Sequence, residues 1–201
     1  DSNESKVEND ISDGIGLEDI EDDGRKEVLP IEEHRQMILH RIRNNRITCI
    51  QGETGCGKSS MVPQFILEDC RRRGVRAKVI VTQPRRIAAL ALSRRVAEQR
   101  QVELGTSVGY RLGQGDREDS KNTSITFVTV GYLLQYLAHK PSYMERYTHV
   151  VLDEVHERSM DMDLLNLVIK KMLPESTTKV VVMSATLQSG LFGEYFTPQF
   201  D

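Results

Sequence analysis

The sequence of 201 residues lacks three features that define large classes of proteins. No apolar run approaches the roughly 20 residues that a membrane-spanning helix requires, and the acidic N-terminus resembles neither a secretory signal nor a transit peptide. The three cysteines form an odd set without the paired spacing of a zinc site, so we expect neither a disulfide framework nor a structural metal. These absences predict a soluble protein without membrane contact in a reducing, intracellular compartment. They do not choose between nucleus and cytoplasm.

Charge is divided unevenly along the chain. Residues 1–27 carry eleven acidic and three basic side chains, few apolar residues and no aromatic ones. Such a segment cannot bury enough surface to offset its ordering entropy, so we predict a disordered, solvated tail. The body, residues 28–201, has 24 basic and 19 acidic side chains, which permits a polyanionic partner without establishing one. The sequence begins with Asp1 and not with methionine, which suggests a piece of a longer protein.

The body alternates β-branched runs with helical patterns. Short buried strands are predicted at residues 47–51, 78–83, 124–130, 149–154 and 179–185. Helices are predicted at residues 31–45, from about Lys58 onward, at 85–101 and at 162–173 before Pro174. This alternation favours an α/β fold with a mainly parallel β-sheet and helices on both faces. Ligands of such folds bind beyond the carboxyl ends of the strands.

The stretch "GETGCGKSS", residues 52–60, matches the phosphate-binding pattern G-x-x-x-x-G-K-[ST] and directly follows a predicted strand. Its glycines let backbone N–H groups converge on an anion, and the following helix adds its positive end. Lys58 supplies a charge for the β- and γ-phosphates, and Ser59 supplies a hydroxyl for Mg²⁺. The alternative is a glycine-rich turn that matches by chance. We predict a nucleoside triphosphate site made of Gly52, Thr54, Gly55, Cys56, Gly57, Lys58, Ser59 and Ser60.

A second acidic site is provided by "VVLDEVHER". Asp153 follows an apolar run, which would place its carboxylate across the sheet end from Ser59, where it can hold Mg²⁺ directly or through a water. Glu154 is the candidate that orients or deprotonates the attacking water. A solvated charge cluster at a helix start is the alternative. His156 has two readings, a functional group or a capping or core histidine, and composition does not choose between them.

Five motifs in order resemble those of the DEAH-box/RNA helicase A-like (DExH) group of superfamily 2 helicases. They are "GETGCGKSS", "TQPRRIAA", "TVGYLL", "DEVHER" and "SAT". The resemblance implies that residues 28–201 are the first of two RecA-like P-loop NTPase domains. It further implies an ATP-dependent RNA helicase, with ATP and Mg²⁺ bound between the two domains and single-stranded nucleic acid, usually RNA, crossing both. The second RecA-like domain would belong to the same full-length chain.

The resemblance also assigns roles by position. Lys58, Asp153 and Glu154 keep the roles given above, and Arg95 is expected to stack on the nucleotide base. Because stacking reads few base edges, poor discrimination between ATP and other triphosphates is implied.

Further positions carry nucleic-acid and coupling roles in that group. Contacts to the nucleic-acid backbone are expected from Arg85 or Arg86, with Arg85 preferred, and from Thr129; such contacts carry little sequence information. The positions that would couple the nucleotide state to domain movement are His156, Ser184 and Thr186.

Some positions depart from the group's pattern. Val130 replaces the usual acid of "TDG", and Gly113 stands where a basic residue of an RNA-gripping hook is often found, so that contact is in doubt. No run with an arginine finger follows "SAT", so we expect the 201-residue chain to bind ATP or ADP with Mg²⁺ but to hydrolyse ATP weakly. We expect this chain to be monomeric, and the resemblance is compatible with an activating protein partner.

Three other functions stay open at this stage. DNA is difficult to exclude as the substrate, because no residue pattern here indicates a contact to the 2′-OH. A P-loop ATPase or kinase of another class would explain the phosphate loop but not the later motifs. A non-catalytic RNA-binding or scaffolding relative would tolerate loss of Lys58, Ser59, Asp153 or Glu154, and all four are present.

Overall fold

The computed structural model describes residues 29–186 and Tyr195. The tail predicted at residues 1–27 lies outside the described residues. Within them, one sheet has the strand order β1-β7-β6-β2-β5-β3-β4, and every neighbouring pair is parallel except β3–β4. The strands are β1 Ile47–Gln51, β2 Val79–Gln83, β3 Val108–Gly113, β4 Asp116–Glu118, β5 Ile125–Thr129, β6 His149–Leu152 and β7 Lys179–Ser184.

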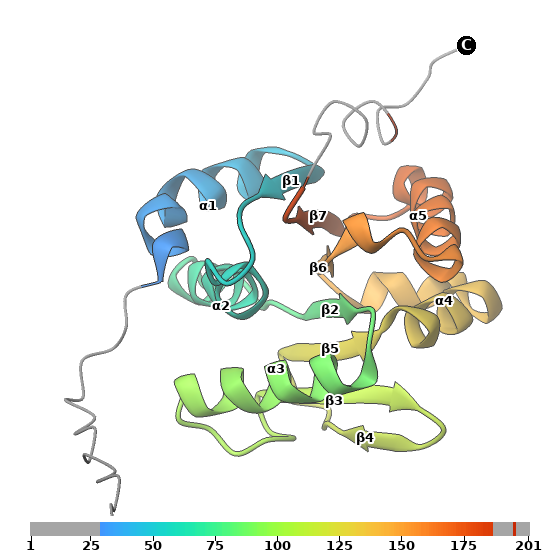
Figure 1. Cartoon of the computed structure of the whole chain (residues 1–201), viewed down its shortest axis with the longest axis horizontal. Coiled ribbons are helices and arrows are strands. Elements are labelled where there is room, and N and C mark those ends of the chain that lie inside the picture. Colours follow the sequence, from blue (N-terminus) through green and yellow to red (C-terminus); the bar gives the residue numbers. More distant parts are fainter. Residues whose placement is uncertain (1–28, 187–194, 196–201) are drawn as a thin grey trace, which may run out of the picture.

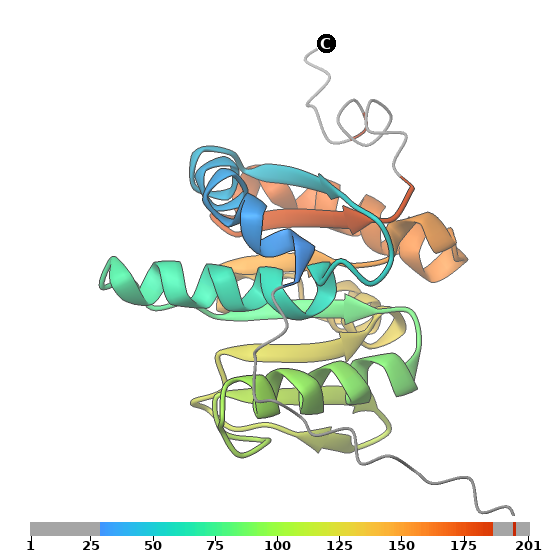
Figure 2. The ribbon, with the colours of Figure 1, turned by 60° about the vertical axis from the view of Figure 1, so that its left-hand side comes forward.

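Helices cover both faces of this sheet (Figures 1 and 2). The α-helices are α1 Arg35–Asn44, α2 Lys58–Arg72, α3 Arg86–Gln99, α4 Val130–His139 and α5 Met160–Met172. Short 3-10 helices are η1 Pro30–His34, η2 Pro141–Arg146, η3 Val155–Glu157 and η4 Leu173–Glu175. Helices α1, α2 and α3 share one hydrophobic core with the sheet, and α4 and α5 share the other. The predicted α/β fold with a mainly parallel, doubly covered sheet is therefore confirmed.

The two cores follow from the alternation of side chains along each strand. In β2, Val79 and Val81 belong to the core under α1–α3, whereas Ile80 between them belongs to the core under α4 and α5. All three are fully buried. Because both faces of the strand are covered, the sequence reads as a continuous apolar run. Burying each such side chain stabilises the fold by about 1.5–3 kcal/mol, so a charged residue here would be strongly destabilising.

Side-chain caps fix where two helices begin at the carboxyl ends of strands. The Thr129 hydroxyl accepts a hydrogen bond from the Tyr132 N–H (3.3 Å) and starts α4 directly after β5. The Ser159 hydroxyl accepts from the Met162 N–H (3.2 Å) and starts α5. Such caps satisfy N–H groups that the helix leaves unpaired. They hold the loops after β5 and β6 at one end of the sheet.

The structure differs from the expected elements in three places. Helix α4 was not predicted, because "TVGYLL" was read as a strand end and a nucleic-acid motif. The hairpin of β3 and β4 at the edge of the sheet was not predicted, because "VGYRLG" contains two glycines and an arginine and "DRE" is entirely charged and exposed. The first predicted helix begins as η1, a 3-10 turn with a proline in its first positions, before the α-helix starts at Arg35. The five predicted strands are present, with ends that move by at most two residues.

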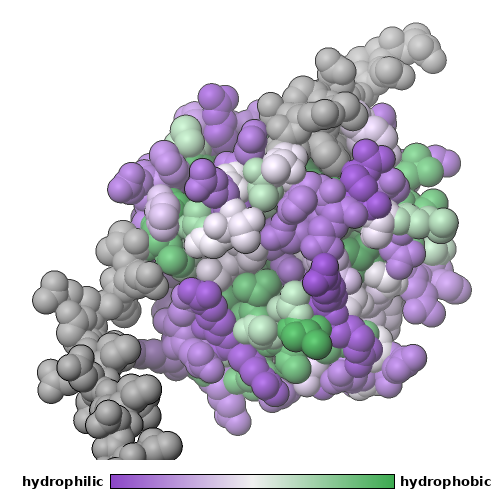
Figure 3. Space-filling model, in the orientation of Figure 1, coloured by the Kyte–Doolittle hydropathy of each residue, from purple (hydrophilic) through white to green (hydrophobic). Residues whose placement is uncertain are grey.

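The surface is mostly hydrophilic on the face seen in Figure 1, with an apolar patch in its lower middle (Figure 3). In the described part of the chain, none of the helices combines the length and the apolar character needed to cross a membrane.

Candidate nucleotide-binding site

The loop between β1 and α2 is curled by two glycines with left-handed backbone. Gly55 has φ = +85° and Gly57 has φ = +99°, a region that residues with side chains rarely adopt. A Cβ on Gly57 would lie 2.8 Å from Leu29 Cδ1, and the Ile31 N–H donates to the Cys56 carbonyl (3.2 Å). The segment that enters η1 therefore packs on the outer side of the loop. The loop leads into the N-terminus of α2, which favours an anion.

Lys58 is the first residue of α2, and its side chain turns back into the loop. The residue is 4 % exposed, and its Nζ donates to the carbonyl oxygens of Gly52 (2.5 Å) and Glu53 (2.8 Å). Its Nζ also lies 3.7 Å from the Cys56 sulfur. The ammonium is thus held inside the curl of the loop. When a phosphate binds there, its oxygens would replace these carbonyl oxygens as the hydrogen-bond partners of Lys58. A buried cation of this kind needs oxygen partners.

Asp153 lies beside the same loop. Strand β6 ends at Leu152, so Asp153 is the first residue past it, and it is fully buried. The Gln83 side-chain amide donates to its Oδ2 (2.5 Å) and the Glu154 N–H to its Oδ1 (3.0 Å). Burial raises the pKa of the Asp153 carboxyl, whereas hydrogen bonds from Ser59 and Gln83 act in the opposite direction.

The contact between Ser59 and Asp153 brings together the two residues predicted as Mg²⁺ ligands. One contributes a hydroxyl and the other a carboxylate, the hard oxygen donors that Mg²⁺ prefers. A buried carboxylate whose charge is costly would gain from a nearby cation. These donors, the ammonium and the helix N-terminus together fit a magnesium-bound triphosphate. The individual roles stay predictions.

The segment after Asp153 contains two residues in a strained conformation. Glu154 has φ = +53° and Arg158 has φ = +40°, and they flank η3. Left-handed backbone at a residue with a side chain costs on the order of 1–2 kcal/mol, and such outliers cluster at functional sites. The Glu154 Oε2 lies 3.2 Å from His156 Nδ1. His156 therefore lies against the predicted base and is only partly exposed.

A family model described as DEAD/DEAH box helicase matches residues 32–191 of this chain. The chain belongs to the DEAD/DEAH box helicase family. The match covers the phosphate loop, the "DEVHER" segment and "SAT", which lie together at one end of the sheet.

Several proteins that are similar to this helicase domain are named as ATP-dependent RNA helicases. The chain is 48% identical over 174 residues to the probable ATP-dependent RNA helicase spindle-E of Aedes aegypti, covering 85% of this chain and 12% of that protein. It is 46% identical over 174 residues to spindle-E of Culex quinquefasciatus, with 86% and 12% covered. It is 42% identical over 171 residues to the ATP-dependent RNA helicase TDRD9 of Danio rerio, with 84% and 13% covered. The chain thus spans about an eighth of the length of these relatives.

The residues predicted to contact nucleic acid in this helicase domain lie at the carboxyl ends of β2 and β5. Arg85 is 77 % exposed at its side chain and lies 3.7 Å from the Glu157 carboxylate. The Arg86 guanidinium donates to the Leu112 carbonyl (2.9 Å) and to Asp116 (2.8 Å). Arg86 therefore links α3 to the β3–β4 hairpin, while Arg85 stays exposed.

Thr129 stands in register with Gln83 at the same end of the sheet. Its hydroxyl is engaged in the cap of α4, a role that the motif did not indicate. The predicted contact to nucleic acid remains a prediction for Thr129 as for both arginines.

The "SAT" motif of the helicase domain ends the strand next to the phosphate loop. Ser184 pairs in register with Gln51, and its carbonyl accepts from the Gly52 N–H (3.2 Å). Its hydroxyl is buried without a hydrogen-bond partner among the described residues. Thr186 is exposed two residues further on. Ser184 is therefore joined to the loop by one backbone hydrogen bond, and its coupling role stays a prediction.

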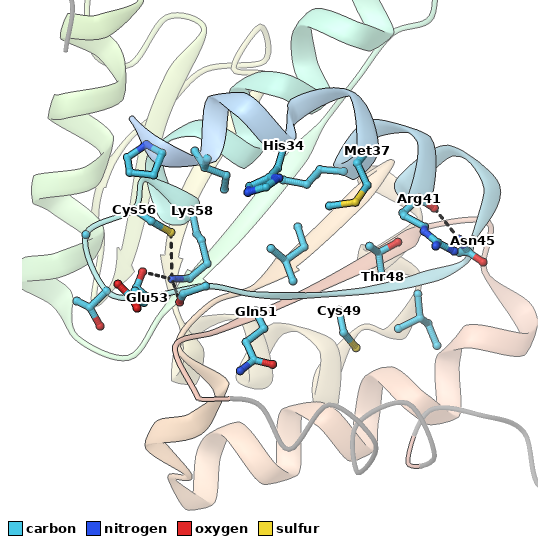
Figure 4. A pocket seen from close by; sticks show the side chains of 18 residues that line it. His34, Met37, Arg41, Asn45, Thr48, Cys49, Gln51, Glu53, Cys56 and Lys58 are labelled. Atoms are coloured by element: carbon cyan, nitrogen blue, oxygen red, sulfur yellow. Dashed lines mark hydrogen bonds between the residues drawn. The ribbon is translucent and has the colours of Figure 1, made fainter. Parts of the chain in front are cut away.

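A cavity of about 890 Å³ adjoins the phosphate loop on the side of β1 and α1. In Figure 4 Lys58 and Cys56 lie at one end of it and Arg41 and Asn45 at the other. Between them lie His34, at the end of η1, and Met37 on α1. The sequence did not indicate this cavity, because it is shaped by the packing of α1 against the edge strand. Arg95 does not line it, since this exposed residue belongs to α3. The stacking role of Arg95 stays untested.

Two of the predicted loop residues have environments that the motif did not specify. Thr54 is exposed and lines the cavity. The Ser60 hydroxyl is buried and donates to the Gly57 carbonyl (3.3 Å). Ser60 would therefore meet a ligand through its backbone N–H and not through its hydroxyl.

Sequence reasoning missed the two residues that hold Asp153 in place. Gln83 is 2 % exposed and donates to the carboxylate. The fully buried Thr82 accepts the Asp153 N–H at its hydroxyl (3.4 Å). Their signal was present, since both are polar residues at the end of an otherwise apolar strand, but "TQPRR" was read only for its arginines.

Proposed function

We propose that this chain is the ATP-binding domain of an ATP-dependent RNA helicase of the DEAH/RNA helicase A type. In this proposal nucleotide hydrolysis drives RNA unwinding or remodelling of ribonucleoprotein. The observation that carries it is the buried Lys58 ammonium inside the left-handed glycine loop, with the buried Asp153 carboxylate at the same end of the sheet. It is supported by the names of relatives that are ATP-dependent RNA helicases. The histidine of "DEVHER", His156, supports the finer DEAH assignment.

The nucleotide half of the proposal assigns one task to each group. Lys58 would release its two carbonyls and hold phosphate oxygens, and the N–H groups at the start of α2 would hold others. Ser59 and Asp153 would hold Mg²⁺, whose contribution is to neutralise charge on the phosphate oxygens. Gln83 fixes the Asp153 carboxylate, and its amide cannot itself titrate.

In this proposal Glu154 would act on water. Its backbone is left-handed, and its Oε2 lies 3.2 Å from His156 Nδ1. A carboxylate in that position would accept a proton from, or orient, a water that attacks the γ-phosphate. His156 would then sense the protonation and position of Glu154 through the 3.2 Å contact.

The nucleic-acid half of the proposal uses the surface at the carboxyl ends of β2 and β5. Arg85 is exposed there, and its contact with Glu157 is a weak, solvated pair that a phosphate could replace. Glu157 belongs to the same turn as His156. An RNA phosphate that binds Arg85 would break the ion pair between Arg85, at the start of α3, and Glu157, and would so release this turn. This gives a short physical route between RNA and the nucleotide site.

The second RecA-like domain would pack at this same end of the sheet. Two of the most exposed large apolar residues in the described chain, Ile87 (82 %) and Met160 (79 %), begin α3 and α5 after β2 and β6. Apolar side chains at the mouth of a site favour a protein contact. Ser184 and Thr186 would report the nucleotide state to that contact.

The test is the substitution Glu154→Gln in the full-length protein. We expect RNA-stimulated ATP hydrolysis to fall by about 100-fold or more while Mg·ATP binding is kept, because the amide cannot take a proton. The matched control is Glu175→Gln on η4, an exposed residue that should leave both activities unchanged. Hydrolysis at the wild-type rate in Glu154→Gln would remove Glu154 from this role. Stimulation by DNA as strong as by RNA would contradict the RNA assignment.

A further inference from the structure

A groove separate from the nucleotide site runs between the β3–β4 hairpin and α4, at the sheet edge seen at the bottom of Figure 1. It consists of two cavities, one of about 580 Å³ and the other of about 410 Å³. Arg111 and Arg117 line both cavities, so the two adjoin. We call them together the hairpin groove. Its first part reaches the hairpin tip at residues 113–116, and its second part reaches Lys78 at the start of β2.

Tyrosine rings form a contiguous row of tilted and edge-on contacts along the α4 wall of the hairpin groove. The ring centroids are 4.9 Å apart for Tyr132 and Tyr136, 4.5 Å for Tyr136 and Tyr143, and 5.5 Å for Tyr143 and Tyr147. Tyr136 is 41% exposed while Tyr143 is almost fully buried. The exposed ring is therefore backed by a fixed row of aromatic side chains, which makes it a rigid platform for another flat group.

Arg111 holds this row of rings in place through hydrogen bonds to two of the tyrosine hydroxyls. Its guanidinium donates to the hydroxyls of Tyr143 (2.9 Å) and Tyr132 (3.4 Å) and to the Asp119 carboxylate. The Asp119 side chain is only 4% exposed. A largely buried, charge-assisted hydrogen bond of this kind, on a guanidinium that also binds two tyrosine hydroxyls, holds its partners in one geometry. Arg111 is thus committed to positioning the rings.

The remaining charges of the hairpin groove are positive and unpaired. The two acidic residues of the lining, Asp116 and Asp119, are already paired with Arg86 and Arg111. Five basic side chains of the lining have no ion-pair partner among the described residues, namely Lys78, Arg117, Lys121, Lys140 and Arg146. Burial, and then the positive charges of Arg76, Arg146 and Arg111, lower the pKa of Lys78. Among the residues that the structure describes, the groove therefore carries an excess of positive charge.

The hairpin groove begins where the proposed nucleic-acid surface ends. Tyr132 lies one turn after Thr129 and its N–H bonds to the Thr129 hydroxyl. At the hairpin tip, Arg86 binds Asp116 and the Leu112 carbonyl. The Tyr132 and Tyr136 side chains that line the groove thus belong to the helix that Thr129 caps.

We infer that the hairpin groove binds a continuation of the single-stranded RNA, an inference that rests on the proposed function. Each nucleotide carries a flat base for the Tyr136 ring and a phosphate for the free cations, which is the combination that single-strand sites use. An acidic peptide would satisfy the cations but offers no flat group in each repeat. Because rings and cations read no base edges, binding along the groove is independent of sequence.

The test measures binding of a fluorescein-labelled oligouridylate of about 20 nucleotides to the 201-residue chain by anisotropy at several salt concentrations. Tyr136→Ala should weaken binding by about 5- to 100-fold, whereas Tyr136→Phe, which keeps the ring, should retain it. Arg117→Gln should reduce the slope of log affinity against log salt by about 0.7. The matched control Lys171→Gln, an exposed cation on α5, should not change that slope.

The outcomes separate this inference from the proposed function. In one outcome the wild type binds RNA, and Tyr136→Ala and Arg117→Gln bind it equally well with an unchanged salt slope. The inference that the groove binds RNA is then wrong, and the proposed function stands. If polyglutamate displaces the RNA at equal charge concentration, the groove binds acidic peptides and the inference is wrong. If the wild type binds no RNA at low salt, the groove and the RNA half of the proposed function both fail, while Mg·ADP binding by the same sample still reports on the nucleotide half.

Discussion

Cys56 shows how one residue of the phosphate loop differs from its neighbours in chemistry. All three cysteines carry free thiols. Burial raises the pKa of the Cys49 and Cys70 thiols, which lowers the fraction of reactive thiolate at neutral pH. Cys56 instead lies in the loop with its sulfur 3.7 Å from Lys58 Nζ. A chemical group added there would occupy the place of a phosphate.

We predict that iodoacetamide at pH 7.5 alkylates Cys56 faster than Cys70, because Cys70 is buried and the raised pKa of its thiol lowers the fraction of reactive thiolate. Mg·ADP should slow this labelling, since the phosphates would cover the loop. The measurement is a time course of peptide masses. In Cys56→Ser the other two thiols should react at their former rates. Equal rates for Cys56 and Cys70 in the folded protein would contradict the prediction.

Motifs predict residues that contact a ligand better than residues that hold those contacts in place. Lys58, Ser59 and Asp153 were predicted from the motifs and their strand and helix context, because phosphate and magnesium chemistry restricts the residue types; their ligand roles stay predictions. Gln83 and Arg111 were not, since their roles depend on partners 70 and 8 residues away that only the folded sheet brings near. A glutamine at a strand end, or an arginine in a strand, has too many possible partners in a sequence.

At the scale of elements, the phosphate loop depends on the segment that packs against it. Leu29 and Ile31 fill the space beside Gly57, where an added Cβ would meet Leu29 Cδ1 at 2.8 Å and Ile31 Cγ2 at 3.1 Å. Gly55 has a similar positive φ but open space around its Cβ position. An alanine at Gly55 would therefore show the cost of backbone strain alone, whereas an alanine at Gly57 would show that cost together with the cost of overpacking.

We predict that Gly55→Ala lowers the free energy of unfolding by about 1–2 kcal/mol, the cost of left-handed backbone. Gly57→Ala should lower it by about 2–5 kcal/mol, because overpacking adds to that strain. Urea denaturation of both variants and the wild type at pH 7 measures the difference. Equal losses would show that the segment before η1 gives way at little cost.

The predictability of the elements follows the same physical division. Buried parallel strands such as β2 and β6 appear in the sequence as β-branched runs because both their faces are covered. The hairpin β3–β4 lies at the sheet edge, where β4 is fully exposed, so no hydrophobic pattern marks it. The hairpin groove depends on that edge, which is why the sequence predicted the nucleotide site but not this surface.

At the scale of the whole molecule, the buried residue His149 makes the free energy of unfolding depend on pH. His149 starts β6 and is 6% exposed, and its Nδ1 lies 2.9 Å from the Thr148 hydroxyl. Burial first, and then the positive charges of Lys179 and Arg73, lower its pKa to about 4. The unfolded chain would titrate this group near 6.5. Between these two values the unfolded state binds the proton more readily than the folded state.

We therefore predict that the free energy of unfolding falls as the pH is lowered from about 7 to about 4.5, with His149 contributing up to about 3 kcal/mol of the loss. The sign follows from the lowered folded pKa, because protonation favours the state in which the imidazole is hydrated. His149→Gln should flatten this part of the profile, whereas His40→Gln, at an exposed position of α1, should leave it unchanged. Urea midpoints at half-unit steps of pH give the measurement. A wild-type profile that is flat over this interval, or an equally steep profile in His149→Gln, would mean that another group controls the acid stability of the domain.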